Sequence, residues 1–131
     1  MSNKLDKILT EISAGELIDK ITILEIKKLK ISDKVKLVEV EKELSSLNKT
    51  MKKSISNDSA ILNHIKALRE INLKLWDIED GKRSAEKNNQ FDEKFIQLAR
   101  NVYKFNDERA KIKLAINNAL GSNIKEVKSY E

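Results

Sequence analysis

Three polar residues interrupt the apolar face of a predicted helix near the end of the chain. From residue 95 to residue 120, positions separated alternately by four and three residues lie on one helical face. This face begins and ends with apolar side chains but carries Asn106, Arg109 and Lys113 at its centre. An amide, a guanidinium and an ammonium on one face can bind an anion, or they can bond to carboxylates of neighbouring helices.

Matching polar residues lie on two other predicted helices. Counting outward from the predicted turns of an antiparallel bundle places Asn72 level with Asn106, so we expect these two amides to meet. The same count places Glu16 and Asp19 level with the two cations of the last helix. Opposite charges should therefore face each other between the first and the last helix. We call this group the polar seam; its members are Glu16, Asp19, Asn72, Asn106, Arg109 and Lys113.

The sequence leaves two interpretations of the polar seam open. In the first, its charges and amides satisfy one another and fix the register of the helices. In the second, the seam is a partly open pocket that binds a small anionic ligand. The candidate ligand-binding residues of this pocket are Lys20, Asn72, Asn106, Arg109 and Lys113, with Glu16 and Asp19 as their network partners.

Carboxylates suggest a different kind of site. Glu16 and Asp19, three residues apart, share one helical face, and so do Asp77 and Asp80, with Glu79 beside them. Their spacing resembles that of the all-α nucleotide pyrophosphohydrolases, which hold magnesium with such paired motifs. The height count separates the two groups by about 14 residues, or about 21 Å along the bundle axis. One metal ion cannot bridge that distance, so a metal-dependent hydrolase stays the alternative and we assign no catalytic residue.

Composition predicts a soluble, all-helical domain. The 131 residues include no proline, three glycines, 40% hydrophobic and 36% charged residues. The absence of cysteine excludes disulfides and thiol catalysis. No apolar run is long enough for a signal peptide or a membrane span, so we expect a cytoplasmic protein without membrane contact. The net charge of +5 comes from lysines interleaved with glutamates, which does not favour nucleic acid as a partner.

Helix-start and helix-stop signals divide the chain into four helices. Ser13 with Glu16 forms a capping box, Asp92 is a second N-cap, and Gly121 is suited to close the last helix. The predicted fold is one domain, 1–131, that forms an antiparallel up-down-up-down four-helix bundle with a short N-terminal segment and a C-terminal tail. The helices are expected at residues 13–31, 33–54, 59–87 and 92–120. Because the first helix is broadly apolar and a second face carries Leu73 and Trp76, a homodimer is also expected.

Three distinctive segments of the chain are GELIDKITILEIK, LWDIED and ARNVYKFNDERAKIK. They resemble a small, all-helical bacterial family of unknown function, and the resemblance extends over nearly the whole chain. The resemblance implies a standalone helical domain with no transferable activity. The pattern residues that it implies include Gly15, Trp76, Glu79, Asp80 and Asp107, together with much of the polar seam.

The sequence as a whole predicts a non-catalytic binding or scaffold module. Its partner is expected to be a small anionic ligand or another protein. No cofactor is expected, apart from the magnesium of the alternative hydrolase interpretation.

Overall fold

The computed structural model describes residues 4–56 and 59–129 of the chain. Within these ranges it contains four α-helices and no strand, which confirms the predicted all-α class. In chain order, the helices are α1 (Ala14–Lys30), α2 (Lys34–Ser54), α3 (Ser59–Lys87) and α4 (Glu93–Leu120). None of the helices in this part of the chain is both long and apolar enough to span a membrane.

Side-chain caps and one glycine set helix ends that matter for the site. The Ser13 hydroxyl accepts a hydrogen bond from the N–H of Glu16 at 3.1 Å, and the Asp92 carboxylate accepts one from the N–H of Phe95 at 3.2 Å. Gly121 ends α4 in the left-handed conformation, with a φ of 63°. Glycine adopts this conformation without the steric cost of a Cβ. The start of α1 and both ends of α4 are therefore encoded locally.

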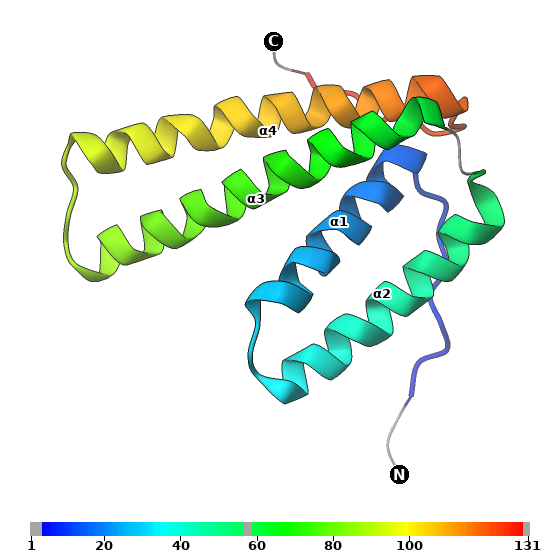
Figure 1. Ribbon diagram of the computed structural model, residues 1–131, viewed down its shortest axis with the longest axis horizontal. Helices are drawn as coiled ribbons and strands as arrows, with labels where there is room; N and C mark the ends of the chain where they lie inside the picture. Colours follow the sequence, from blue (N-terminus) through cyan, green and yellow to red (C-terminus); the bar gives the residue numbers. More distant parts are fainter. Residues whose placement is uncertain (1–3, 57–58, 130–131) are drawn as a thin grey trace.

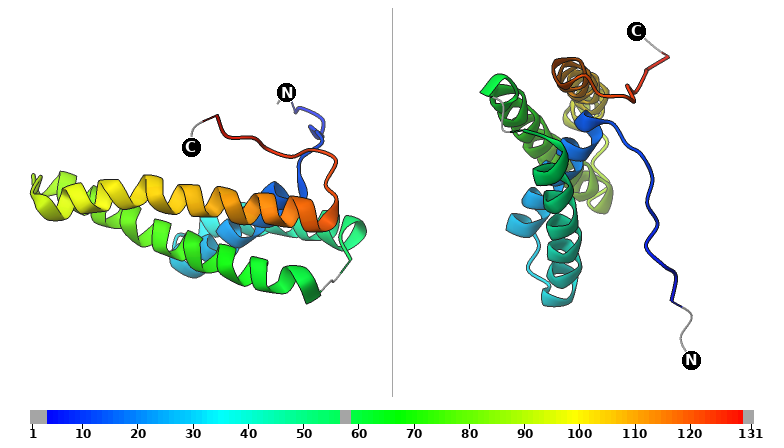
Figure 2. Two further views of the ribbon diagram at one scale, coloured as in Figure 1. Left: turned by 90° about the horizontal axis from the view of Figure 1, so that it is seen from above. Right: turned by 90° about the vertical axis from the view of Figure 1, so that its right-hand side faces the viewer.

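Helix α1 is the central element of the bundle. It packs against α2, α3 and α4, whereas α2 packs along α1 and not along α3 or α4. Figures 1 and 2 show α3 and α4 as a long hairpin, with α1 beside one half and the other half extending past it. Helix α1 has 17 residues and α4 has 28, so α1 can cover only part of the hairpin.

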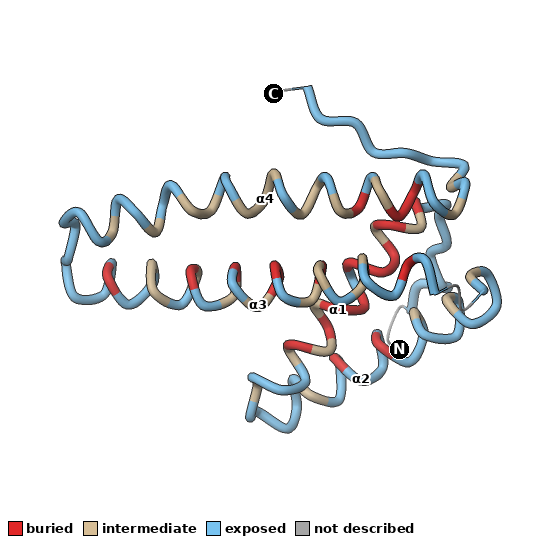
Figure 3. The backbone as a smooth tube through the Cα atoms, turned by 45° about the horizontal axis from the view of Figure 1, so that its top comes forward, coloured by how far each residue is buried: buried red, intermediate tan, exposed pale blue. Residues whose placement is uncertain are grey.

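Two apolar clusters form the core, and α1 contributes to both. Leu17 and Leu24 pack against α2 in the first cluster. In the second, Ile18 packs with Leu68 of α3 and Ile116 of α4, and each of these three is at most 1% exposed. The buried residues of α4 all lie in its C-terminal part, close to α1 (Figure 3). Burying such side chains stabilises the fold by about 1.5–3 kcal/mol each, so α1 carries much of the stability.

The first turn of α1 is held by the C-terminal end of α4. The N–H of Gly15 donates to Asn117 Oδ1 at 2.6 Å, and the N–H of Ala14 donates to Ser122 Oγ at 3.1 Å. A Cβ on Gly15 would lie 2.5 Å from the carbonyl oxygen of Lys113. Real side chains do not approach a backbone atom so closely, so glycine is required here for close helix packing.

We expect Gly15→Ala to destabilise the protein by about 1–3 kcal/mol, because the new methyl group must displace a backbone carbonyl. Urea denaturation followed by circular dichroism measures the free energy of unfolding. The matched control is Gly81→Ala, whose Cβ would meet the flexible end of Leu98 at 3.2 Å. Alanine favours the helix by about 0.5–1 kcal/mol over glycine, so the control should be neutral or stabilising. Equal losses in the two variants would contradict a specific close contact at Gly15.

Candidate functional site

The buried ammonium of Lys113 joins three carboxylates. Its Nζ donates to Glu16 Oε2 at 2.5 Å and lies 3.6 Å from Glu126 and 3.9 Å from Asp19. The Lys113 side chain is 11% exposed and the Asp19 side chain is 6% exposed. A buried charge is tolerated when it is paired in this way, because the pairing offsets the lost hydration. Lys113 therefore ties α1, α4 and the C-terminal tail together.

Asn72 of α3 extends this network to the third helix. Its Nδ2 donates to Asp19 Oδ1 and to Thr22 Oγ1, both at 2.8 Å. The Thr22 hydroxyl in turn donates to the carbonyl oxygen of Asp19 at 2.8 Å. On its other side, Asn72 Oδ1 accepts a hydrogen bond from Arg109 at 3.3 Å. An ion pair and two hydrogen bonds thus connect Lys113 to Arg109 through Asp19 and Asn72.

The structure corrects the expected contact between Asn72 and Asn106, and it places the candidate ligand-binding residue Lys20 outside the polar seam. Asn106 forms no hydrogen bond with Asn72 in the described part of the chain, so the predicted amide pair is wrong. The amide of Asn72 instead donates to α1, where the ionised carboxylate of Asp19 is a stronger acceptor than a second amide. Lys20 is largely solvent-facing and lies 4.0 Å from Glu16.

The charge of Lys113 changes the acidity of Glu16. Burial by itself would raise the pKa of this carboxyl group. The hydrogen bond from Lys113 and the positive charges of Lys113, Lys20 and Arg109 outweigh burial and hold the pKa below its ordinary value of 4.5. Glu16 is therefore ionised wherever the protein is folded near neutral pH.

A cleft of about 320 Å³ opens on the α3 side of the polar seam. Helix α1 supplies an apolar wall with Ile23 and Ile26, and α3 adds Leu75 and Trp76. The polar residues that line the cleft come from α3 and α4; they are Asn72, Glu79, Asp80, Arg83 and Arg109. The volume lies within the range of small-molecule sites, about 300–1,000 Å³.

Arg109 differs from Lys113 in its partners, although the two cations lie one helical turn apart. Within the described residues, the Arg109 guanidinium forms no ion pair with a carboxylate, and its hydrogen bond goes to the neutral amide of Asn72. Glu16 and Asp19, which the height count placed beside both cations, contact Lys113 instead. The remaining donors of Arg109 are therefore open to a ligand in the cleft.

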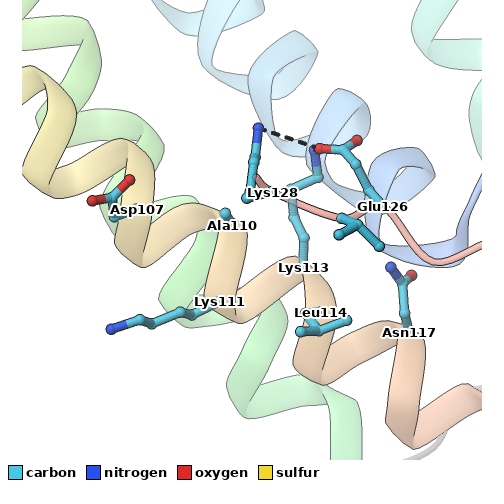
Figure 4. Close-up of a pocket in the computed structure, with 9 residues that line it drawn as sticks. Asp107, Ala110, Lys111, Lys113, Leu114, Asn117, Glu126 and Lys128 are labelled. Atoms are coloured by element: carbon cyan, nitrogen blue, oxygen red, sulfur yellow. Dashed lines mark ion pairs between the residues drawn. The ribbon is translucent and has the colours of Figure 1, made fainter. Parts of the chain in front are cut away.

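A second cavity, of about 380 Å³, lies between α4 and the C-terminal tail. In Figure 4, Lys113 reaches from α4 toward Glu126 of the tail, while Lys111 points away from both. Glu126 also pairs with Lys128 at 3.6 Å, so it balances two of the cations that line this cavity. Asn117 lines the same cavity, and its Nδ2 is buried without a hydrogen-bond partner in the described part of the chain.

The comparison with known proteins agrees with the resemblance seen in the sequence. The model of a family of unknown function, DUF6165, matches residues 8–131. The chain belongs to this family. No curated protein and no solved structure matched the DUF6165 chain.

The four carboxylates of the alternative metal site do not lie together in this DUF6165 chain. Glu16 and Asp19 contact the ammonium of Lys113, whereas Glu79 and Asp80 line the cleft. Within residues 4–56 and 59–129, no group of three or more acidic, histidine or cysteine side chains is placed to hold a metal ion. The carboxylates on α1 pair with Lys113 and those on α3 line the cleft, so among the described residues the four do not form one metal centre.

Sequence reasoning missed Thr22 of the hydrogen-bond network and four further contributors to the site. Arg83 lines the cleft, Asn117 and Ser122 hold the first turn of α1, and Glu126 pairs with Lys113. Two of them carry a sequence signal, since Arg83 follows Glu79 by four residues and Asn117 follows Lys113 by four. Ser122 and Glu126 follow the end of α4, where there is no helical periodicity from which their positions could be predicted.

We expect Lys113→Met to destabilise the protein by about 3 kcal/mol, the lower end of the range for a broken buried pair. The substitution leaves Asp19 buried without its cation, whereas the partly exposed Glu16 can still be solvated. Urea denaturation measures the loss. The matched control, Lys111→Met, removes an exposed lysine of the same helix that forms no ion pair among the described residues. A loss no greater than in this control would exclude a structural role for the ion pairs.

We also expect the effect of Glu16→Gln to depend on pH. Because the folded-state pKa lies below 4.5, the ionised carboxylate stabilises the fold above that pH. The contribution declines as the pH falls from 4.5 through the folded-state pKa. The stability difference between wild type and variant should thus be greatest near about pH 7 and shrink by about pH 3. Urea denaturation across this range checks it, with the exposed Glu39→Gln as the control that shows no such trend. A difference independent of pH would mean that Glu16 acts through its shape alone.

Proposed function

We propose that this protein is a helical binding module that receives a small anionic ligand in the cleft between α1, α3 and α4. The observation that carries the proposal is the Arg109 guanidinium, which lines the cleft without a carboxylate partner in the described residues. A guanidinium offers five donors in a planar fork that suits phosphate and carboxylate groups. Arg109 is the proposed anion-binding residue, and Asn72 orients it.

The environment of Lys113 assigns it a different role. Its charge is already balanced by Glu16, Asp19 and Glu126. An anion that bound Lys113 would have to displace one of these carboxylates. We therefore attribute the rigidity of the site to Lys113 and the binding of the anion to Arg109.

The walls of the cleft suggest that the ligand also has an apolar part. Ile23, Ile26, Leu75 and Trp76 line the cleft beside the polar residues. Small-molecule sites commonly combine apolar walls with a few polar groups that fix orientation. An organic phosphate or carboxylate fits this combination better than a bare inorganic ion does.

Binding without catalysis agrees best with the positions of the acidic residues. The carboxylates on α1 and those of the cleft do not converge on one metal position in the described part of the chain. A magnesium-dependent hydrolase remains the alternative, and it requires turnover of a nucleotide in the presence of magnesium.

We expect Arg109→Ala to weaken binding by at least about tenfold, because it removes a charge-assisted hydrogen bond worth about 1.5–3 kcal/mol. Thermal shift and isothermal titration measure binding of hexyl phosphate, inorganic phosphate and nucleoside monophosphates, with and without magnesium. The free variant should stay folded, because Asn72 keeps its bonds to Asp19 and Thr22.

The matched control is Arg100→Ala, which removes an exposed arginine of α4 that has no ion pair in the described residues. Its affinities should equal those of the wild type. The proposal fails if no compound in the panel stabilises the wild type, or if Arg109→Ala binds as tightly. Nucleotide hydrolysis that depends on magnesium would favour the alternative.

A further inference from the structure

We infer that the ligand of the cleft carries an amino group at the end opposite its anion. This inference rests on the proposed function, in which Arg109 binds the anion. It assigns the far end of the cleft, where Glu79 and Asp80 lie, to a positively charged hydrogen-bond donor.

Along α3, the lining of the cleft changes from an amide to apolar side chains and then to carboxylates. Asn72, Trp76 and Asp80 follow one another at intervals of four residues, so they share one helical face. Asn72 lies at the Arg109 end, Trp76 with Leu75 forms the apolar middle, and Asp80 lies beyond it. At 1.5 Å per residue, Asp80 lies about 12 Å along the helix axis from Asn72.

The carboxylates at the far end retain free acceptor capacity. Asp80 forms no hydrogen bond or ion pair in the described part of the chain, and Glu79 contacts Lys82 at 3.4 Å through one oxygen. Arg83 lines the same end but pairs with neither carboxylate among the described residues. Ionised carboxylates can only accept hydrogen bonds, so the ligand group that they bind must be a donor.

Charge and distance together define the ligand class. The far end carries two carboxylates and one cation, Arg83, so its lining is net negative, whereas the other end carries the guanidinium of Arg109. This arrangement matches a molecule with an anion and an ammonium separated by an apolar or aromatic segment. The indole of Trp76 suits such a segment, because its face attracts both flat rings and cations. An anion whose far end lacks a donor would gain no hydrogen bond from these two carboxylates, which stay in contact with solvent.

The test compares two probes that differ only in one amino group. Aminohexyl phosphate and hexyl phosphate share the same anion and apolar spacer. We expect isothermal titration with the full chain to give aminohexyl phosphate about tenfold higher affinity, since a charge-assisted hydrogen bond is gained. Asp80→Asn should remove most of this preference, measured as the ratio of the two affinities. Glu79→Gln, alone and combined with Asp80→Asn, divides the effect between the two carboxylates.

The matched control is Asp77→Asn, which changes an exposed aspartate of α3 that does not line the cleft. This variant should keep the full preference for the amino compound. Equal affinity of the wild type for both probes would refute the amino-group assignment and leave the anion site at Arg109 standing. Binding of neither probe would refute the proposed function and the inference with it. A preference that survives the double variant would show that the two carboxylates are not the acceptors.

Discussion

The first turn of α1 touches the backbone of α4 where there is room for a hydrogen atom and not for a methyl group. This contact sets the distance between the two helices, and the hydrogen bonds to Asn117 and Ser122 set the height of α1 along α4. The ion pair follows from the same approach, because the residue after Gly15 is Glu16 and its carboxylate then meets Lys113. A larger side chain at position 15 would push α1 outward and separate the charges that make up the polar seam.

Close packing also gives two neighbouring cations different roles. Lys113 lies where α1 approaches most closely, so its ammonium is enclosed by carboxylates and contributes to register. Arg109 lies one turn closer to the centre of the hairpin, where its hydrogen-bond acceptor is the neutral amide of Asn72. A charge with a neutral partner at the edge of a cavity can gain more from an incoming anion than one that is already neutralised.

Local signals predicted the helices well, because caps and turns depend on neighbouring residues. The predicted start at Ser13 and stop at Gly121 match the observed caps. The meeting of Glu16 with Lys113 was also predicted, since equal height in neighbouring helices needs only residue counting. The contact between Asn72 and Asp19 was not predicted, because it depends on how closely α1 packs against the α3–α4 hairpin. A partly open pocket at the polar seam was one of the two interpretations of the sequence, but the position and walls of the cleft were not predicted. Its shape depends on where the short helix α1 ends beside the two longer helices α3 and α4.

The unequal helix lengths divide the molecule into regions of different cooperativity. The half of the α3–α4 hairpin away from its turn shares an apolar cluster with α1. The half nearer the turn lies beyond α1 and is stabilised by contacts within the hairpin (Figure 1). Segments with fewer buried contacts open at lower free energy than the global unfolding transition. The cleft spans this boundary, since Ile23 and Ile26 belong to α1 and Arg83 lies near the turn between α3 and α4. A molecule bound there would bridge the two regions, so that occupancy of the cleft is coupled to the local opening of the hairpin.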